Sequence, residues 1–250
     1  MSFRASLLGL CCLLAGCAVV ERPAPVYTDI QAFSANRPGM EMPRGWRPWI
    51  ITKAKAPTQY DLVVDPITQR VVLHAVSERA ATGLKQRLDV DPGLRPWVYW
   101  QWRVERLIDQ ADITARHADD SPVRLLLFFD GDHATLPARE RMLMDTARML
   151  TGQAVPFATL MYVWENQQPV GTVIPHPAMG QIKTVVAGSG HDPRLGQWKM
   201  FERNYVDDYR RAFGQPPGKL VGIGILTDTD NTASSVEAFY GDIELRAAGR

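Results

Sequence analysis

From residue 49 onward the chain consists of short hydrophobic runs separated by turn residues, a pattern typical of β-strands. The runs are rich in Val, Ile and aromatic side chains, which favour strands, and Pro, Gly and Asp stand at their ends. The pattern predicts about ten strands, which cover residues 60–65, 70–76, 83–90, 97–104, 123–129, 159–164, 182–187, 198–201, 219–226 and 236–245.

Two segments have helical spacing instead. Residues 137–151 begin with Pro137, which suits the first turn of a helix. Residues 204–213 begin with Asn204 as a candidate N-cap, and Gly214 follows as a stop. Many short strands with two helical insertions predict a mostly β protein, a two-sheet β-sandwich or jelly roll, and not alternating βαβ units.

The most aromatic predicted strand, residues 97–104, has two different faces. One face would carry Val98, Trp100, Trp102 and Val104 and form core. The other combines aromatic rings with hydrogen-bonding groups, as a sugar-binding surface does, and consists of Trp97, Tyr99, Gln101 and Arg103. Structural packing is the alternative for this second face, and the same two alternatives apply to Trp164, Trp198, Tyr205 and Tyr240.

The N-terminus predicts export. Arg4 precedes an apolar run that ends in Leu13-Leu14-Ala15-Gly16-Cys17, which resembles the lipobox of a bacterial lipoprotein signal peptide. The run over residues 5–20 is shorter than the ~20 residues of a membrane-spanning helix. We therefore expect residues 1–16 to be removed and Cys17 to be lipidated.

The resemblance to bacterial lipoproteins also implies a location. An aspartate after the cysteine would favour the inner membrane, but Ala18 stands there, so we expect anchoring to the periplasmic face of the outer membrane. Residues 17–45 contain scattered Pro, Gly and Asn and predict a flexible tether. Residues 46–250 are then a single domain.

Charge and cysteine content exclude several classes of protein. The chain has 28 basic and 27 acidic side chains, and loss of Arg4 leaves 27 of each, which argues against a nucleic-acid partner. All three cysteines, at positions 11, 12 and 17, precede the predicted domain. The domain therefore has no disulfide, cysteine nucleophile or thiolate metal ligand.

Asp228 and Asp230 follow an apolar strand and superficially match the opening motif of a haloacid-dehalogenase-type phosphatase. That chemistry requires a doubly wound α/β sheet downstream, which is not predicted here. Three interpretations remain: the side chains cap a turn, act on a ligand, or bind structural calcium. Phe239 occupies the position where an EF-hand requires glutamate. We expect no cofactor, with structural calcium as the alternative; the histidines show no zinc-type spacing.

Two arginines require partners. Arg203 lies four residues before Asp207, which predicts a surface ion pair if the segment is helical. Arg124 opens an apolar strand and needs a carboxylate if it points inward. Its candidate partners are Asp119, Asp120, Asp207 and Asp208. Spacing alone leaves structural and ligand-binding roles open for both arginines.

Several of these segments together resemble an uncharacterised bacterial family, the domain of unknown function 3047, over nearly all of residues 46–246. The segments that carry the resemblance are residues 100–104, 119–124, 162–165, 203–209 with 213–214, and 222–232 with 240–243. The resemblance implies a galactose-binding-like jelly roll, similar to carbohydrate-binding modules. It implies no established activity.

These observations predict a lipid-anchored protein of the cell envelope with a non-catalytic, glycan-like ligand-binding sandwich. The predicted ligand-binding residues are Tyr99, Arg103, Arg124, Trp164, Arg203, Asp207, Asp228, Asp230 and Asn231. One alternative is an envelope polysaccharide hydrolase that uses Asp228 and Asp230 with Asp120 or Asp208, which requires two carboxyl groups about 5–10 Å apart across a cleft. Another is a scaffold lipoprotein.

Overall fold

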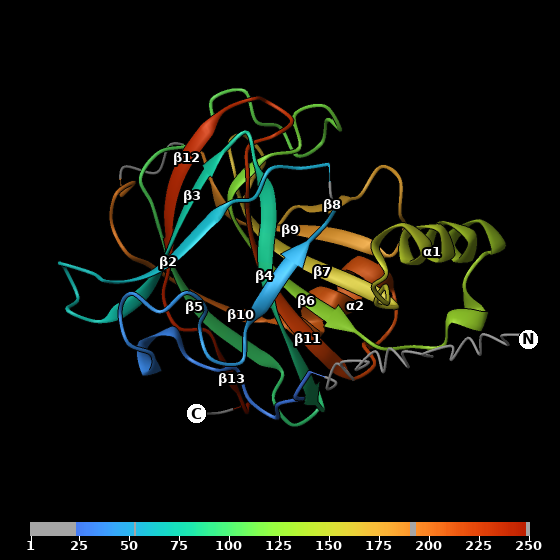
Figure 1. Ribbon diagram of the computed structural model, residues 1–250. Helices are drawn as coiled ribbons and strands as arrows, with labels where there is room; N and C mark the ends of the chain where they lie inside the picture. The colour runs from blue at the N-terminus through green and yellow to red at the C-terminus, as the bar shows by residue number, and fades with distance from the viewer. Residues whose placement is uncertain (1–23, 53, 191–193, 249–250) are drawn as a thin grey trace, which may run out of the picture.

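Two β-sheets packed face to face form the protein (Figure 1). The computed structural model describes residues 24–52, 54–190 and 194–248. The predicted signal peptide and Cys17 lie outside these residues. One sheet has seven strands in the order β1-β4-β11-β6-β7-β9-β8, and the other has six, with β10-β5-β12-β3-β2 in order and β13 beside β5.

The strands of the seven-stranded sheet are β1 (Arg47–Ile50), β4 (Ala81–Val90), β6 (Ser121–Phe129), β7 (Ala158–Glu165), β8 (Val173–Pro175), β9 (Ile182–Ser189) and β11 (Leu220–Asp228). Those of the six-stranded sheet are β2 (Gln59–Val64), β3 (Val71–Glu78), β5 (Trp97–Val104), β10 (Lys199–Asn204), β12 (Ser235–Tyr240) and β13 (Glu244–Arg246). The strands pair antiparallel except for β7 and β9, which are parallel. The predicted jelly-roll sandwich is confirmed; the short edge strands β1 and β8 were not predicted.

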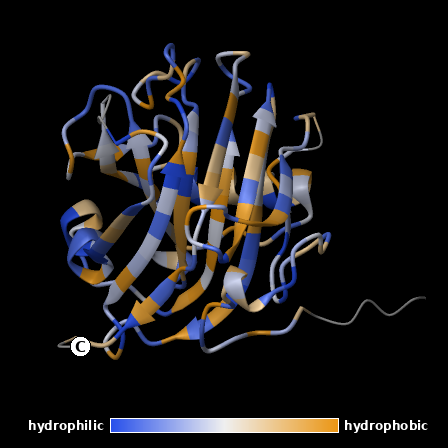
Figure 2. Ribbon diagram, turned by 90° about the vertical axis from the view of Figure 1, so that its left-hand side faces the viewer, coloured by the Kyte–Doolittle hydropathy of each residue, from blue (hydrophilic) through white to orange (hydrophobic). Residues whose placement is uncertain are grey.

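Alternation along the strands fills the space between the sheets, and it appears as alternating colour along the ribbons of Figure 2. In β5 the predicted core face of Val98, Trp100, Trp102 and Val104 is buried. The Trp100 ring stacks on Tyr162 of β7 and on Phe201 of β10, with centroid distances of 5.0 and 5.2 Å. Aromatic packing therefore joins the two sheets.

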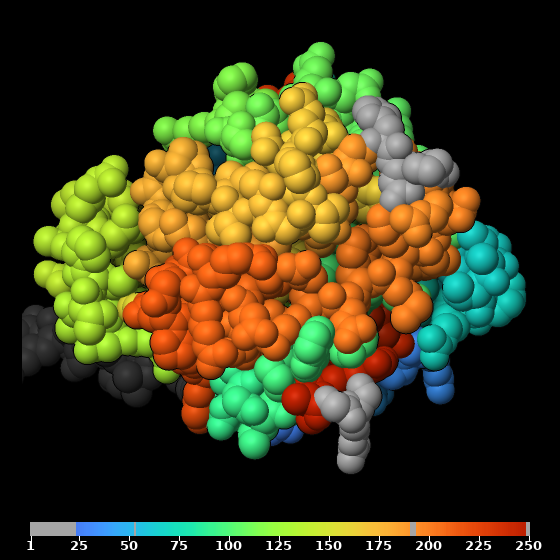
Figure 3. Space-filling model, turned by 180° about the vertical axis from the view of Figure 1, so that it is seen from behind, coloured from blue at the N-terminus to red at the C-terminus, as the bar shows by residue number. Residues whose placement is uncertain are grey.

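Both predicted helices are confirmed, as α1 (Ala138–Thr151) and α2 (Tyr205–Phe213). The Asn204 side chain caps α2 by accepting from the backbone N–H of Asp207, and Gly214 ends the helix at a φ of 73°. The α2 helix contacts β5 and β10 of one sheet and β9 of the other, so it closes a side of the sandwich (Figure 3). Two short 3-10 helices are η1 (Phe33–Ala35) and η2 (His133–Thr135).

The predicted tether of residues 17–45 needs correction, because residues from 24 to 45 pack against the sandwich. Phe33 is 1% exposed and stacks on Trp46 at 5.0 Å. The Trp46 indole N–H donates to the carbonyl of Gln31, and Ser34 donates its backbone N–H to Asp242 near the other end of the chain. The folded unit therefore begins well before residue 46. In the described part of the chain, no helix combines the length and hydrophobicity needed to cross a bilayer.

Candidate functional site

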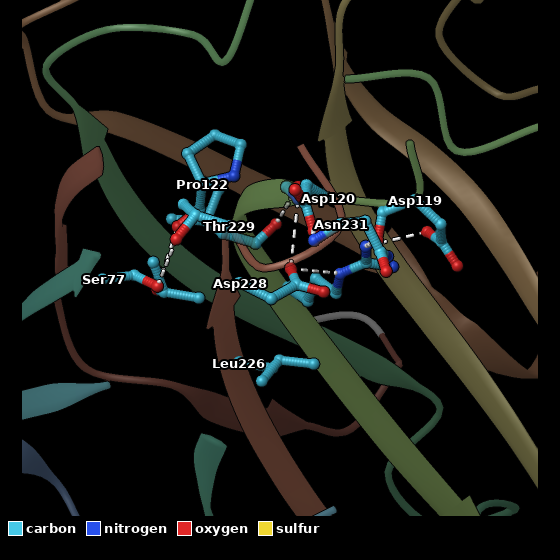
Figure 4. A network of polar contacts seen from close by, with 12 residues as sticks. Ser77, Asp119, Asp120, Pro122, Leu226, Asp228, Thr229 and Asn231 are labelled. Atoms are coloured by element: carbon cyan, nitrogen blue, oxygen red, sulfur yellow. Dashed lines mark hydrogen bonds and ion pairs between the residues drawn. The ribbon is translucent and has the colours of Figure 1, made fainter. Parts of the chain in front are cut away.

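A buried ion-pair network connects β6 and β11 (Figure 4). Arg124 of β6 donates its Nε–H to Oδ1 of Asp228 at 2.9 Å and an Nη2–H to Oδ1 of Asp119 at 2.8 Å. Arg124 and Asp228 are 3% and 5% exposed. Burial raises the pKa of Asp228 to about 6, against the opposing charge of Arg124. Of the predicted partners of Arg124, Asp119 is one that the structure shows; Asp228 was not foreseen.

Asp120 fixes the turn that follows β11. Its carboxylate accepts from the backbone N–H groups of Asn231 at 3.2 Å and Thr232 at 2.7 Å, and from the Thr232 hydroxyl at 2.6 Å. Asp230 forms an ion pair with Lys55 at 2.9 Å. These contacts correspond to the turn-capping interpretation of the aspartates.

The calcium alternative fits this cluster poorly. Oxygen atoms of Asp120, Asp228 and Asp230 lie within 4.8 Å of one another, and such a donor set is of the type that hard cations take. However, the guanidinium of Arg124 and the ammonium of Lys55 already neutralise charge here, and Asp120 receives three protein hydrogen bonds. A divalent cation would have to compete with each of these donors.

The Arg203 pairing also differs from the prediction. Arg203 donates two hydrogen bonds to Asp208, at 2.8 and 2.7 Å, while Asp207 pairs with Arg210. The hydroxyl of Tyr162 donates to the same Asp208 carboxylate at 2.9 Å. Residue 203 is the penultimate residue of β10 and not part of α2, so the helical spacing assumed in the prediction does not apply. This network joins α2 to both sheets.

A second network lies on the outer face of the six-stranded sheet. Arg103 of β5 pairs with the buried carboxylate of Asp65, and its guanidinium lies 3.8 Å from the ring centroid of Phe239. His74 of β3 stacks on Phe239 at 4.5 Å. The indole N–H of Trp198 donates to Oδ2 of Asp65 at 3.0 Å. Arg103 is 6% exposed, so it supports the Trp198 ring from below rather than contacting solvent.

Beside this network lies a small cavity of about 50 Å³, which we name the Trp198 cavity. Val71, Val72 and Gly241 line it with backbone or apolar groups, and the polar or aromatic lining consists of Ser34, Thr68, Arg70, Gln101, Trp198 and Asp242. Trp198 and Gln101 are half-buried and Arg70 is exposed. Within the described residues, the Gln101 amide and the Arg70 guanidinium have no hydrogen-bond partner. Both are therefore available to a ligand.

The glycine at position 241 keeps the Trp198 cavity open. A Cβ atom there would lie 3.0 Å from the Cβ of Gln101 and 3.4 Å from the Trp198 ring. The position also brings Asp242 to the cavity, where its carboxylate accepts from the Ser34 hydroxyl at 2.5 Å. Residues from three distant parts of the chain thus meet at one small opening.

A larger, more open cavity of about 220 Å³ lies between the segments 106–110 and 234–235. Its one arginine, Arg106, donates to the carbonyl and the hydroxyl of Ser235 at 2.9 and 2.8 Å. No aromatic residue is among its described lining residues. It offers less to a sugar-like ligand than the Trp198 cavity does.

The structure does not bring the predicted ligand-binding residues together. Trp164 is 2% exposed and packs in the core, so it offers no ring face to a ligand. The Tyr99 hydroxyl donates to Glu202 at 2.5 Å, and the Arg246 guanidinium lies 3.9 Å from its ring centroid. The remaining predicted residues belong to the three networks described above or to surface pairs, and Asn231 lies in the turn held by Asp120.

Sequence reasoning did not select Trp198, Gln101, Arg70 or Asp242 for the site. Trp198 and Gln101 were noted as aromatic or outer-face positions, so the signal for them was present. Arg70 and Asp242 reach the cavity only because the β2–β3 turn and the segment after β12 meet there. No local pattern in the sequence predicts that these two segments lie side by side.

The two packed sheets and the helix that bridges them define a β-sandwich of the jelly-roll type. The Trp198 cavity opens on the outer face of its six-stranded sheet. The chain belongs to the family described as "Protein of unknown function (DUF3047)", whose profile matches residues 44–244. This confirms the resemblance seen in the sequence. No curated protein sequence matches the chain.

The chain is similar to 33 chains of solved structures. One is the endoglucanase 3 of Trichoderma harzianum, from family GH12, with a TM-score of 0.39 and 10% identity over 83% of this chain and 93% of that chain. Another is "Cellulose induced protein, Cip1", with a TM-score of 0.32 and 9% identity over 80% of this chain and 90% of that one.

Proposed function

We propose that this protein is a lipid-anchored binding protein of the bacterial cell envelope. Its sandwich would hold a glycan or another polyhydroxylated ligand, without catalysis, at the Trp198 cavity. The observation that carries the proposal is a half-buried indole ring, fixed by a buried carboxylate, beside an amide and a guanidinium that have no described partner.

The chemistry of these groups suits a sugar. The apolar C–H faces of a sugar ring pack on an indole, and its hydroxyl groups exchange hydrogen bonds with amide and guanidinium groups. Because Asp65 holds the Trp198 ring in place before binding, little side-chain entropy is lost when the ligand arrives. A volume of about 50 Å³ admits only part of one ring, so the ligand would extend over the outer face of the six-stranded sheet.

The proposed location rests on the sequence before the described residues. Cys17 with the preceding Leu-Leu-Ala-Gly supports lipidation, and Ala18 supports the periplasmic face of the outer membrane. Mass spectrometry of the mature N-terminus tests the first point. Fractionation of the two membranes tests the second.

The hydrolase alternative receives less support from the geometry. Glycoside cleavage needs two carboxyl groups facing each other across a cleft. Asp228 is buried against Arg124, Asp230 pairs with Lys55, and Asp208 is held by Arg203. Among the described residues these carboxylates are therefore occupied by structural partners.

Binding is tested with the purified protein, a panel of neutral oligosaccharides, and two readouts: Trp fluorescence and the thermal unfolding midpoint. A sugar at a concentration of about 100 times its Kd stabilises the native state by about 2.7 kcal/mol. The substitutions W198A and Q101A are expected to abolish this stabilisation. V170A, at an exposed loop position between β7 and β8 of the other sheet, is the matched control and should retain it.

The proposal fails if no oligosaccharide shifts the midpoint of the wild-type protein. It also fails if W198A and Q101A bind a stabilising sugar as well as V170A does, because the ligand would then occupy another surface.

A further inference from the structure

The α1 helix leaves an apolar stripe uncovered. Met142, Met149 and Leu150 are 62%, 86% and 78% exposed, whereas the buried residue of α1 is Met144 on the opposite side. Helical geometry places the three exposed residues and Thr146 on one face. Exposed apolar side chains gathered in this way mark an interaction surface.

The C-terminal end of α1 lies over the outer face of the seven-stranded sheet, and the helix stands clear of the sandwich in Figure 1. Gln153, two residues beyond the helix, accepts from the ammonium of Lys85 on β4. Its side-chain amide also donates to the backbone carbonyl of Ile50 on β1 at 3.3 Å. These contacts fix the position of the exposed stripe relative to the sheet.

The chain enters the domain at the same place. The carbonyl of Ala24, the first described residue, accepts from Arg87 of β4 at 3.2 Å. Lys85 and Arg87 are two residues apart on one strand, so both side chains emerge on the same face, about 7 Å apart. Ala24 therefore lies close to the end of α1.

This position limits how far a lipid anchor can be from α1. Cys17 precedes Ala24 by seven residues, and even a fully extended segment of that length spans at most about 25 Å. A membrane that holds a lipidated Cys17 would thus lie close to this face of the protein. Because this connection is short, it favours contact between the membrane and the exposed apolar stripe of α1.

The charges around the stripe suit an anionic lipid surface. Arg139 lies on α1 on the side of the exposed stripe, where Asp145 is the bordering acidic residue, and Arg47 is the strand neighbour of Lys85. Both arginines are exposed, and neither forms an ion pair with a carboxylate in the part of the chain that the structure describes. Basic side chains flanking an apolar helical stripe are typical of helices that lie in a membrane interface.

We infer that α1 is a second membrane contact, which lies on the bilayer surface beside the lipid anchor and inserts Met142, Met149 and Leu150 at the boundary of headgroups and acyl chains. The inference rests on the proposed lipidation of Cys17. It adds an orientation: the outer face of the seven-stranded sheet would face the membrane, and the Trp198 cavity, on the other sheet, would face away from it.

The test uses the lipidated full-length protein with a spin label at T146C, in the middle of the stripe. No native cysteine lies in the domain, and lipidation occupies Cys17, so the label is site-specific. The protein is reconstituted in vesicles of phosphatidylethanolamine and phosphatidylglycerol. The expected result is a loss of collisions with a water-soluble nickel relaxation agent and a gain of collisions with oxygen.

Two controls make the outcome decisive. A label at V170C, an exposed loop position 57% accessible, should keep its collisions with the nickel agent after reconstitution. The double substitution M149E/L150E should restore water access at position 146 while the protein stays bound to the vesicles through its lipid. Both substituted side chains are exposed, so the fold should be unaffected.

Mass spectrometry of Cys17 separates the two proposals. If Cys17 is lipidated but the label at 146 stays fully accessible to the nickel agent, the α1 contact is overturned and the anchor stands. If Cys17 is unmodified, the anchor itself fails. If the label is shielded without vesicles, in a way that depends on protein concentration, a second copy covers the stripe and the membrane inference is overturned.

Discussion

Trp198 and Asp65, 133 residues apart in the chain, are joined by a hydrogen bond from the indole N–H to Oδ2 at 3.0 Å. The same carboxylate pairs with Arg103 and accepts from the backbone N–H and hydroxyl of Thr68. One buried charge therefore orients an aromatic ring, an arginine and a turn. The geometry of the Trp198 cavity depends on it.

We predict that D65N destabilises the protein by about 3–5 kcal/mol, because it removes the buried carboxylate that pairs with Arg103 and leaves that guanidinium only the partly exposed Glu105. Urea unfolding monitored by circular dichroism measures the change. D61N, at an exposed position of β2, is the matched control and should stay within about 0.5 kcal/mol of the wild type. An equally small effect of D65N would mean that the ion pair contributes little.

The substitution G241A is predicted to weaken ligand binding more than stability. The added methyl group would lie 3.0 Å from the Cβ of Gln101 and 3.4 Å from the Trp198 ring, and so narrow the cavity. Titration with the sugar that stabilises the wild type should show a loss of at least about tenfold in affinity, which corresponds to about 1.4 kcal/mol. Unchanged affinity would place the ligand elsewhere.

Residues 24–46 are predicted to contribute to the stability of the domain. F33A removes a ring that is 1% exposed and stacked on Trp46, and we expect a loss of about 3–5 kcal/mol. Urea unfolding measures it, with M40A, at an exposed position of the same segment, as the control. If F33A has the same free energy of unfolding as the wild type, the segment does not stabilise the domain and the tether prediction stands.

Asp228 is predicted to lower the free energy of unfolding as the pH rises, the reverse of the usual effect of a carboxylate in an ion pair. Burial raises its pKa to about 6 in the folded protein, compared with about 3.9 in an unfolded chain. Between these values the folded state binds more protons than the unfolded state. The free energy of unfolding should therefore fall as the pH rises from about 4 to 6, by up to about 1.4 kcal/mol per pH unit.

The comparison of wild type with D228N isolates this contribution, because other carboxylates titrate in both proteins. Urea midpoints at several pH values between about 4 and 7 are measured for each. The difference between the two profiles should change with pH in this range and level off above it. Parallel profiles would show that Arg124 keeps the Asp228 carboxylate ionised throughout.

The sequence predicted the elements that local chemistry determines. Alternation placed Trp100 and Trp102 in the core, and Asn204 and Gly214 marked the ends of α2, because caps and strand periodicity act over a few residues. The tether was predicted wrongly for residues 24–45. Phe33 and Trp46 are isolated aromatics in a segment without periodicity, and only contacts with distant residues bury them.

The candidate site was less predictable for the same reason. Arg124 was expected to need a carboxylate, but its partner Asp228 depends on the β6–β11 register, in which a bulge near Asp228 shifts the pairing. Asp65 and Trp198 meet only because a turn and an edge strand of one sheet lie together. Non-local pairings of this kind leave no signature in the spacing of residues along the chain.

The two edges of the seven-stranded sheet are both short and both contain proline. β1 has four residues with Pro48, and β8 has three and ends at Pro175. Proline donates no backbone hydrogen bond, and short strands offer few free groups to a neighbouring molecule. When many copies are concentrated in a confined layer, these two edges offer few free backbone groups that could pair with the sheet of a neighbouring molecule. The short, proline-containing edges therefore protect the protein against fibril-like self-association.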